Sequence, residues 1–129
     1  MFITHIAIWT NELEKMKEFY ERYFGMVCGE KYHNPQKNFS SYFLSFSDGA
    51  QIELMTIYGL KSQDVSRNPV CGIAHFAIQM ENRQAVGQLT ERFRSDGIII
   101  FSEPRLTGDG YYESCILDPD GNQIELVSV

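Results

Sequence analysis

The sequence predicts an α+β fold made of two βαβββ modules, and two repeated phrases predict it. DGAQIEL at 48–54 returns as DGNQIEL at 120–126, 72 residues later (from 48 to 120). HIAI at 5–8 returns as HFAI at 75–78, 70 residues later (from 5 to 75). Self-similarity at a nearly constant offset indicates a duplicated structural unit. Each half therefore opens with H-x-A-I and closes with DG-x-QIEL.

The first half predicts a strand, a helix and three further strands, in that order. After HIAI, apolar residues recur at helical spacing between Leu13 and Phe24. Asn11 is a predicted N-cap, and Gly25 is placed to end the helix. Short β-rich runs follow at 27–32, 41–47 and 51–57.

The second half repeats this order. Val86, Leu89 and Phe93 have helical spacing behind the predicted N-cap Asn82, and Gly97 is the predicted stop. The expected strands are 98–102, 112–117 and 123–129. A polar stretch joins the halves. We predict one domain over 1–129, with module one at about 1–58, a linker at about 59–72 and module two at about 73–129.

Composition limits the function classes. The chain has 129 residues, a formal net charge of −6 and three cysteines. An acidic balance argues against nucleic acid as a partner, and no apolar run has the length of a membrane span. An odd number of separated cysteines does not indicate a disulfide framework. We expect a cytoplasmic protein that does not bind membranes or nucleic acid.

Four polar side chains are predicted to share one face of the sheets. Side chains alternate faces along a strand, and the large aliphatic face of each module should pack on its helix. The opposite face then carries His5, Glu53, His75 and Glu125. The His-to-Glu spacing is 48 residues in one half (5 to 53) and 50 in the other (75 to 125). If the mixed sheets curl into one cup about a pseudo-twofold axis, with the helices outside, all four meet.

Two imidazoles and two carboxylates are a ligand set for one divalent transition metal. The set suits Zn²⁺, Ni²⁺, Co²⁺, Mn²⁺ or Fe²⁺ better than Ca²⁺ or Mg²⁺, which prefer oxygen ligands. A single histidine at a strand start, or a single IEL, is more often an ordinary residue of an amphipathic strand. The repetition of both pairs favours a metal site.

The sequence resembles the vicinal oxygen chelate superfamily, which includes glyoxalase I. The resemblance rests on HIAIWTNELEKMKEFYERYFGM, GIAHFAI and the terminal DPDGNQIELV. It implies a metal, most readily Zn²⁺ or Ni²⁺, held by His5, Glu53, His75 and Glu125. It also implies a lyase or isomerase of the lactoylglutathione lyase type, acting through a metal-stabilised enediolate on a small substrate with two adjacent oxygens. Glu125 and Glu53 are both candidates for the base.

The sequence departs from that family at the thiol-binding positions. Glyoxalase I members commonly carry an Arg four residues after the first His and an Asn four residues after the first Glu, but Trp9 and Ile57 stand here. This weakens the case for glutathione as a cosubstrate. We expect substrate to contact Trp9, Met55 and Ile57, and to accept a hydrogen bond from Tyr111.

Several alternatives stay open. An Fe²⁺ extradiol dioxygenase and a thiol transferase of the fosfomycin-resistance type are two alternatives. Neither needs a metal ligand at the position of Glu53, so the presence of Glu53 argues against both. A protein that binds a small molecule without turnover is a third. We expect a homodimer, in which the modules meet within one chain or are exchanged between two. The cations Lys61, Arg67 and Arg105 are expected in loops, as is His33, and Cys115 is expected as a small buried hydrophobe.

Overall fold

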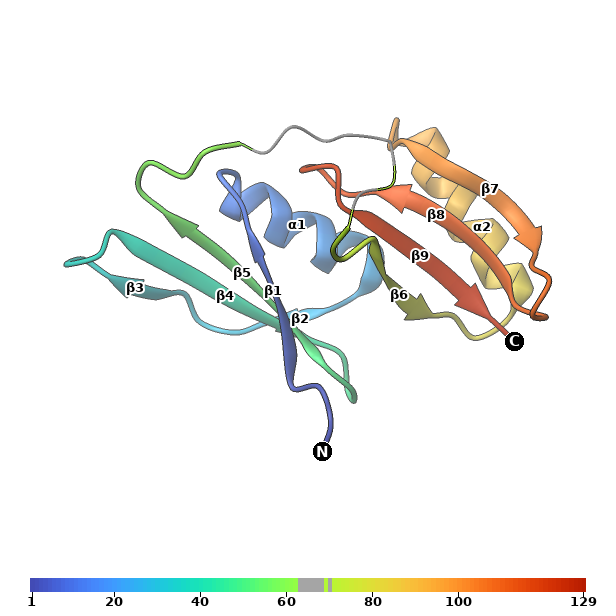
Figure 1. Cartoon of the computed structure of the whole chain (residues 1–129), viewed down its shortest axis with the longest axis horizontal. Helices are drawn as coiled ribbons and strands as arrows, with labels where there is room; N and C mark the ends of the chain where they lie inside the picture. The colour runs from blue at the N-terminus through green and yellow to red at the C-terminus, as the bar shows by residue number, and fades with distance from the viewer. Residues whose placement is uncertain (63–68, 70) are drawn as a thin grey trace. The chain divides into compact units, whose positions relative to one another are not determined.

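The computed structural model describes residues 1–62, 69 and 71–129 (Figure 1). The chain divides into two compact units, Met1–Asp64 and Val65–Val129. The cation Arg67 lies outside the described residues. None of the helices in the described part of the chain is long and apolar enough to cross a membrane.

The first unit contains one helix and one mixed sheet. Its elements are β1 (His5–Trp9), α1 (Leu13–Phe24), β2 (Val27–Cys28), β3 (Tyr32–Asn34), β4 (Phe39–Ser45) and β5 (Gln51–Ile57). The strand order is β1-β5-β4-β2, and β3 pairs with β4. Strand β1 runs parallel to β5, whereas the other pairs are antiparallel.

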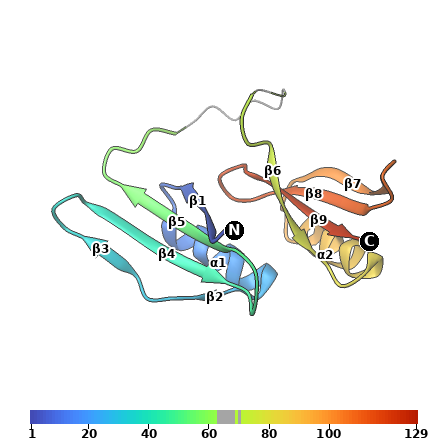
Figure 2. The same cartoon turned by 60° about the horizontal axis from the view of Figure 1, so that its bottom comes forward.

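The second unit has the same connectivity. Its elements are β6 (His75–Gln79), α2 (Arg83–Ser95), β7 (Ile100–Leu106), β8 (Tyr112–Leu117) and β9 (Gln123–Ser128). The order β6-β9-β8-β7, with β6 parallel to β9, matches β1-β5-β4-β2 of the first unit. Each helix covers one face of its own sheet (Figures 1 and 2). The predicted α+β fold with paired βαβββ modules is confirmed.

The aliphatic face of each sheet forms the core of its unit. In β5 the alternate residues Ile52 and Leu54 are buried, and in β9 Ile124 and Leu126 are buried. The helices contribute apolar side chains that are also fully buried, among them Tyr20, Met16, Val86 and Phe93. Burial of this apolar area stabilises each unit. It also fixes which face of each strand is turned away from the helix.

The helix termini agree with the sequence at three of four places. The Asn82 side chain accepts a hydrogen bond from the Ala85 N–H at 2.9 Å. Both predicted stops adopt the left-handed region: Gly25 (φ 64°) is the C-cap of α1, and Gly97 (φ 78°) follows Asp96, the C-cap of α2. The prediction for Asn11 was wrong, because Glu12 occupies the N-cap position and makes no side-chain cap.

Thr10 and Leu60 explain why Asn11 does not cap α1. The Thr10 hydroxyl accepts a hydrogen bond from the Glu12 N–H at 2.9 Å, which shifts the helix start by one residue. The Asn11 amide instead donates to the Leu60 carbonyl oxygen at 3.3 Å. Asn11 therefore connects the loop after β1 to the loop after β5.

Two strand predictions need correction. The run 27–32 is not one strand, because only 27–28 pair with β4 before the chain resumes pairing at β3. His33 therefore lies in a strand rather than a loop, and its Nδ1 is 2.8 Å from the Ser40 hydroxyl. The predicted strand 98–102 runs instead to Leu106. The register of β7 shifts between Ser102 and Arg105, around Pro104, which cannot donate to the ladder. Arg105 is consequently a strand residue.

Candidate functional site

The first candidate pair joins β1 and β5. In their parallel register His5 is opposite Gln51 and Ala7 is opposite Glu53. His5 and Glu53 are thus diagonal neighbours on the face turned away from α1. The His5 Nε2 lies 3.7 Å from the Glu53 Oε2, with side chains 42% and 15% exposed. The pairing brings together two residues that are far apart in the sequence.

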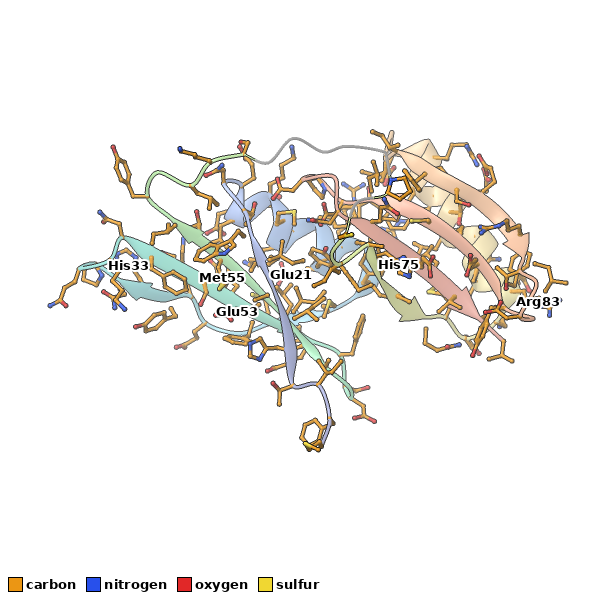
Figure 3. The ribbon with its side chains drawn as sticks, in the orientation of Figure 1. Glu21, His33, Glu53, Met55, His75 and Arg83 are labelled. Carbon is orange, nitrogen blue, oxygen red and sulfur yellow. The ribbon has the colours of Figure 1, made fainter. Side chains whose placement is uncertain are left out.

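The second pair repeats this arrangement between β6 and β9. His75 is opposite Gln123, and Ala77 is opposite Glu125. The His75 Nε2 lies 3.1 Å from the Glu125 Oε2, with side chains 40% and 21% exposed. Figure 3 labels Glu53 on β5 and His75 on β6. In both units the repeated phrase places a carboxylate beside the imidazole of the parallel strand.

The Glu125 carboxyl lies in an acidic setting. Burial is the largest cause that raises its pKa above the ordinary value, and the nearby Glu113 and Asp109 raise it further. His75 and Arg105 oppose the rise. Glu125 therefore holds a proton more readily than an exposed glutamate does.

The orientation of the His5 ring has two visible causes. Its Nδ1 lies 3.1 Å from the Thr4 hydroxyl. The edge of the ring also meets Phe43 at a centroid distance of 5.5 Å and an interplanar angle of 79°. With Nδ1 turned to Thr4, Nε2 is the nitrogen directed to Glu53. A histidine held in this way through Nδ1 is suited to bind a metal through Nε2.

An open cavity of about 450 Å³ borders Glu125 in the second unit. Its lining comes from β6, β8, β9 and the turn before β8: Ala77, Gln79, Asp109, Tyr111, Glu113, Glu125 and Val127. Tyr111 is thus placed where a substrate beside Glu125 can reach it. The turn that carries it is fixed by the Thr107 hydroxyl, which accepts a hydrogen bond from the Tyr111 N–H at 3.1 Å.

An aromatic surface surrounds the first pair. Trp9 is opposite Met55 in the β1–β5 register, and Ile57 lies two residues further along β5. All three therefore share the face of Glu53. The exposed Trp9 ring meets Phe39 edge-on at 6.1 Å. Figure 3 labels Met55 beside Glu53 on the same strand. The three predicted contact residues of this unit thus lie near the first His–Glu pair.

Sequence reasoning missed two acidic residues of the cavity, Glu113 and Asp109. Glu113 is opposite Val127, and Cys115 is opposite Glu125, so both face the cavity side of the sheet. The alternation of side chains along the strand 112–117 predicts that Glu113 lies on this face. No local pattern in the sequence indicates its ion-pair partner. That partner is Arg105, whose Nη2 lies 3.1 Å from the Glu113 Oε1.

The predicted burial of Cys115 is confirmed, since the residue is 5% exposed. Burial, followed by the nearby Glu125 charge, raises the pKa of its thiol to about 11. Cys115 is therefore a protonated side chain beside Glu125 rather than a reactive thiolate.

Each unit contains one imidazole beside one carboxylate. Over the described residues no group of three His, Cys, Asp or Glu side chains is arranged to hold a metal ion. A pair with side chains partly exposed and donor atoms 3.1 to 3.7 Å apart can turn both donors to one ion. The donor types fit a transition metal, and two pairs together would complete a four-ligand set.

Comparison with known proteins places these pairs in a family context. The family model of the Glyoxalase/Bleomycin resistance protein/Dioxygenase superfamily matches residues 2–126. A probable lactoylglutathione lyase of Synechocystis is 28% identical, over 98% of this chain and 95% of that protein.

Two solved structures are also similar. Glyoxalase I of Zea mays matches with a TM-score of 0.81 and 28% identity, over 98% of this chain but only 44% of the maize chain. The trypanothione-dependent glyoxalase I of Leishmania major matches with a TM-score of 0.80 and 25% identity, over 99% of this chain and 86% of that chain.

Proposed function

This chain belongs to the Glyoxalase/Bleomycin resistance protein/Dioxygenase superfamily, and from that premise we propose that it is a metal-dependent lyase or isomerase of the glyoxalase I type. The two His–Glu pairs carry the proposal. They lie on strands of the same rank in each module, in the same parallel register, on the face opposite the helix. The similarity to a probable lactoylglutathione lyase over nearly the whole of both proteins supports it.

We propose that His5, Glu53, His75 and Glu125 together hold one divalent metal. Neutral imidazole and carboxylate donors suit Zn²⁺ and Ni²⁺ best, with Co²⁺, Mn²⁺ and Fe²⁺ as further candidates. The contact between His5 Nδ1 and the Thr4 hydroxyl supports ligation through Nε2. The full set arises either within one chain or between the chains of the predicted homodimer.

Bound in this set, the metal would polarise two adjacent oxygens of a substrate and so lower the cost of removing the proton beside its carbonyl. The chain itself supplies the base. Glu125 is the stronger candidate, because it borders a cavity with room for a substrate and its pKa is raised by burial. It would remove a proton from one carbon and return it to the next. Glu53 is the other candidate.

The remaining predicted contact residues position the substrate and exclude water. Trp9, Met55 and Ile57 offer apolar surface beside Glu53, and the Tyr111 hydroxyl is available for a hydrogen bond in the cavity. The thiol partner is a separate question. One similar structure is described as trypanothione-dependent, and Trp9 and Ile57 replace the polar residues expected for glutathione. Cytoplasmic location and homodimer formation stay predictions.

The test combines metal analysis with turnover. Untagged protein is supplied with Zn²⁺, Ni²⁺, Co²⁺ and Fe²⁺ in turn, and bound metal is measured by mass spectrometry. Methylglyoxal is then offered with and without glutathione, and loss of the dicarbonyl and formation of the 2-hydroxyacyl product are followed. We expect one metal for each set of four ligands and at least a hundredfold loss of kcat in Glu125→Gln, the scale of general-base catalysis.

Glu103→Gln is the matched control, because Glu103 is a charged β7 residue that pairs with Arg94 rather than with the proposed site. It should keep both metal and activity. Failure to bind any of the four metals would contradict the shared site. Bound metal without turnover of any dicarbonyl would leave a binding protein of the same fold.

A further inference from the structure

The cavity beside Glu125 has an uneven charge. Three carboxylates line it, from Asp109, Glu113 and Glu125, and no lysine or arginine is among the lining residues in the described part of the chain. The Glu113 side chain is only 15% exposed, so its charge is partly removed from water. Coulomb interactions strengthen where water is displaced. A substrate group that enters this cavity therefore meets negative charge, apart from the metal itself.

Arg105, the cation paired with Glu113, does not reverse that charge. The Arg105 guanidinium contacts Glu113 at 3.1 Å and donates to the Ser102 hydroxyl at 2.8 Å. Both contacts hold it along β7, outside the cavity lining. To bind an anion in the cavity, Arg105 would have to leave two partners and expose the Glu113 carboxylate. That exchange is unfavourable for an anionic ligand.

The position of Glu113 follows from the strand register. Glu113 is opposite Val127 and Cys115 is opposite Glu125, so Glu113 lies one diagonal step from the proposed base. A ligand that is held at Glu125 and fills this cavity would lie beside both carboxylates.

Tyr111 is a second, separate feature of the same wall. Tyr111 is 41% exposed and lines the cavity. In the sequence it stands between Asp109 and Glu113, which line the same cavity. The face of a tyrosine ring attracts cations, including quaternary ammonium groups. An aromatic face next to carboxylates favours an ammonium group over a carboxylate or sulfonate.

We propose that this cavity selects a thiol partner that carries a cationic ammonium group and disfavours an anionic one such as glutathione. This inference rests on the proposed function. Glu113 and Asp109 are the specificity-determining residues, and Tyr111 supplies the aromatic face. The thiol adds to the aldehyde to give a hemithioacetal. Transfer of one proton between its two carbons then gives the thioester of a 2-hydroxy acid, with no atom lost or gained.

Three thiols of one skeleton test this selection, because they differ only in the group two carbons from sulfur. They are thiocholine, 2-mercaptoethanol and 2-mercaptoethanesulfonate, which are cationic, neutral and anionic. With methylglyoxal, kcat/KM should fall in that order, by about tenfold or more between the first and last at low salt. The ratio should shrink as salt is added. The ratio of kcat/KM between the cationic and the anionic thiol should also fall in Glu113→Gln and Asp109→Asn, and it should stay unchanged in Glu103→Gln.

A readout that needs no turnover separates this inference from the proposed function. Cationic, neutral and anionic nitroxides are added to the protein, and their relaxation of amide protons in β8 and β9 is compared by NMR. The cationic probe should accumulate at the cavity, and Glu113→Gln should reduce the effect. Equal effects of the three probes, or a preference for the anionic one, would overturn the inference whether or not the protein is an enzyme. Cation enrichment without turnover of any hemithioacetal would support the cavity's charge selection and overturn the proposed function alone.

Discussion

Removal of either module's histidine should abolish the same metal-dependent stabilisation. His5→Ala and His75→Ala act on different units, and the described residues of each unit show one His–Glu pair, at 3.7 Å or 3.1 Å. If one ion needs both pairs, the two variants should lose it equally. If a single pair is enough, only one variant should lose it.

The size of the effect can be worked out from linkage. A metal present at 100 times its dissociation constant stabilises the folded state by about 2.7 kcal/mol. At roughly 2.1 cal/mol/K per residue, a chain of 129 residues unfolds with an entropy of about 270 cal/mol/K. Their ratio gives a rise in Tm of about 10 °C. Loss of one of four ligands should reduce this to a change of about 2 °C or less.

Differential scanning calorimetry with and without Zn²⁺ or Ni²⁺ measures the rise directly. His33→Ala is the control. His33 on β3 contacts Ser40 on β4, and it lies outside both His–Glu pairs. It should show the full metal-dependent rise from its own baseline. A full rise in His5→Ala, with none in His75→Ala, would show that module two binds metal alone and would refute the shared site.

Three further outcomes follow from other parts of the chain. The hydrogen bond from Lys31 lowers the pKa of Glu14, so its contribution to stability is present above the ordinary value of 4.5 and is lost as the pH falls through the lowered pKa. In melts followed by circular dichroism, the Tm difference between wild type and Glu14→Gln should therefore vanish in acid; a difference that persists there would contradict this origin. Because burial raises the pKa of Cys115 to about 11, iodoacetamide at pH 8 should label the exposed Cys71 first by peptide mass mapping, and equal labelling rates would refute the assignment. Asp118 is 4% exposed and accepts at least three hydrogen bonds within its turn. Asp118→Ala should therefore lower the free energy of unfolding in urea by about 2–3 kcal/mol. A loss below about 1 kcal/mol would show that the polar groups of the turn are satisfied by other means.

The sequence by itself determined the repeated module and the face of each strand. Both depend on local patterns, the 3.6-residue period of a helix and the alternation of a strand, and the repeat shows them twice. For this reason the alternation predicted that Ile52 and Leu54 are buried and that Glu53 points away from the helix. The helix stops at Gly25 and Gly97 were also predictable, because a left-handed residue after a helix favours glycine.

The tertiary structure decided which distant residues meet. The pairs His5–Glu53 and His75–Glu125 depend on parallel pairing of the first and last strands of each module, and nothing local in the sequence specifies that register. The same holds for Arg105, which its local sequence indicated as a loop residue and which pairing with β8 placed opposite Glu113. Register is a long-range property, set by how whole strands bury their apolar faces. The sequence therefore predicted the two His–Glu pairs as candidate ligands, and the packing of the strands supplied the distances within each pair and the acidic cavity beside Glu125.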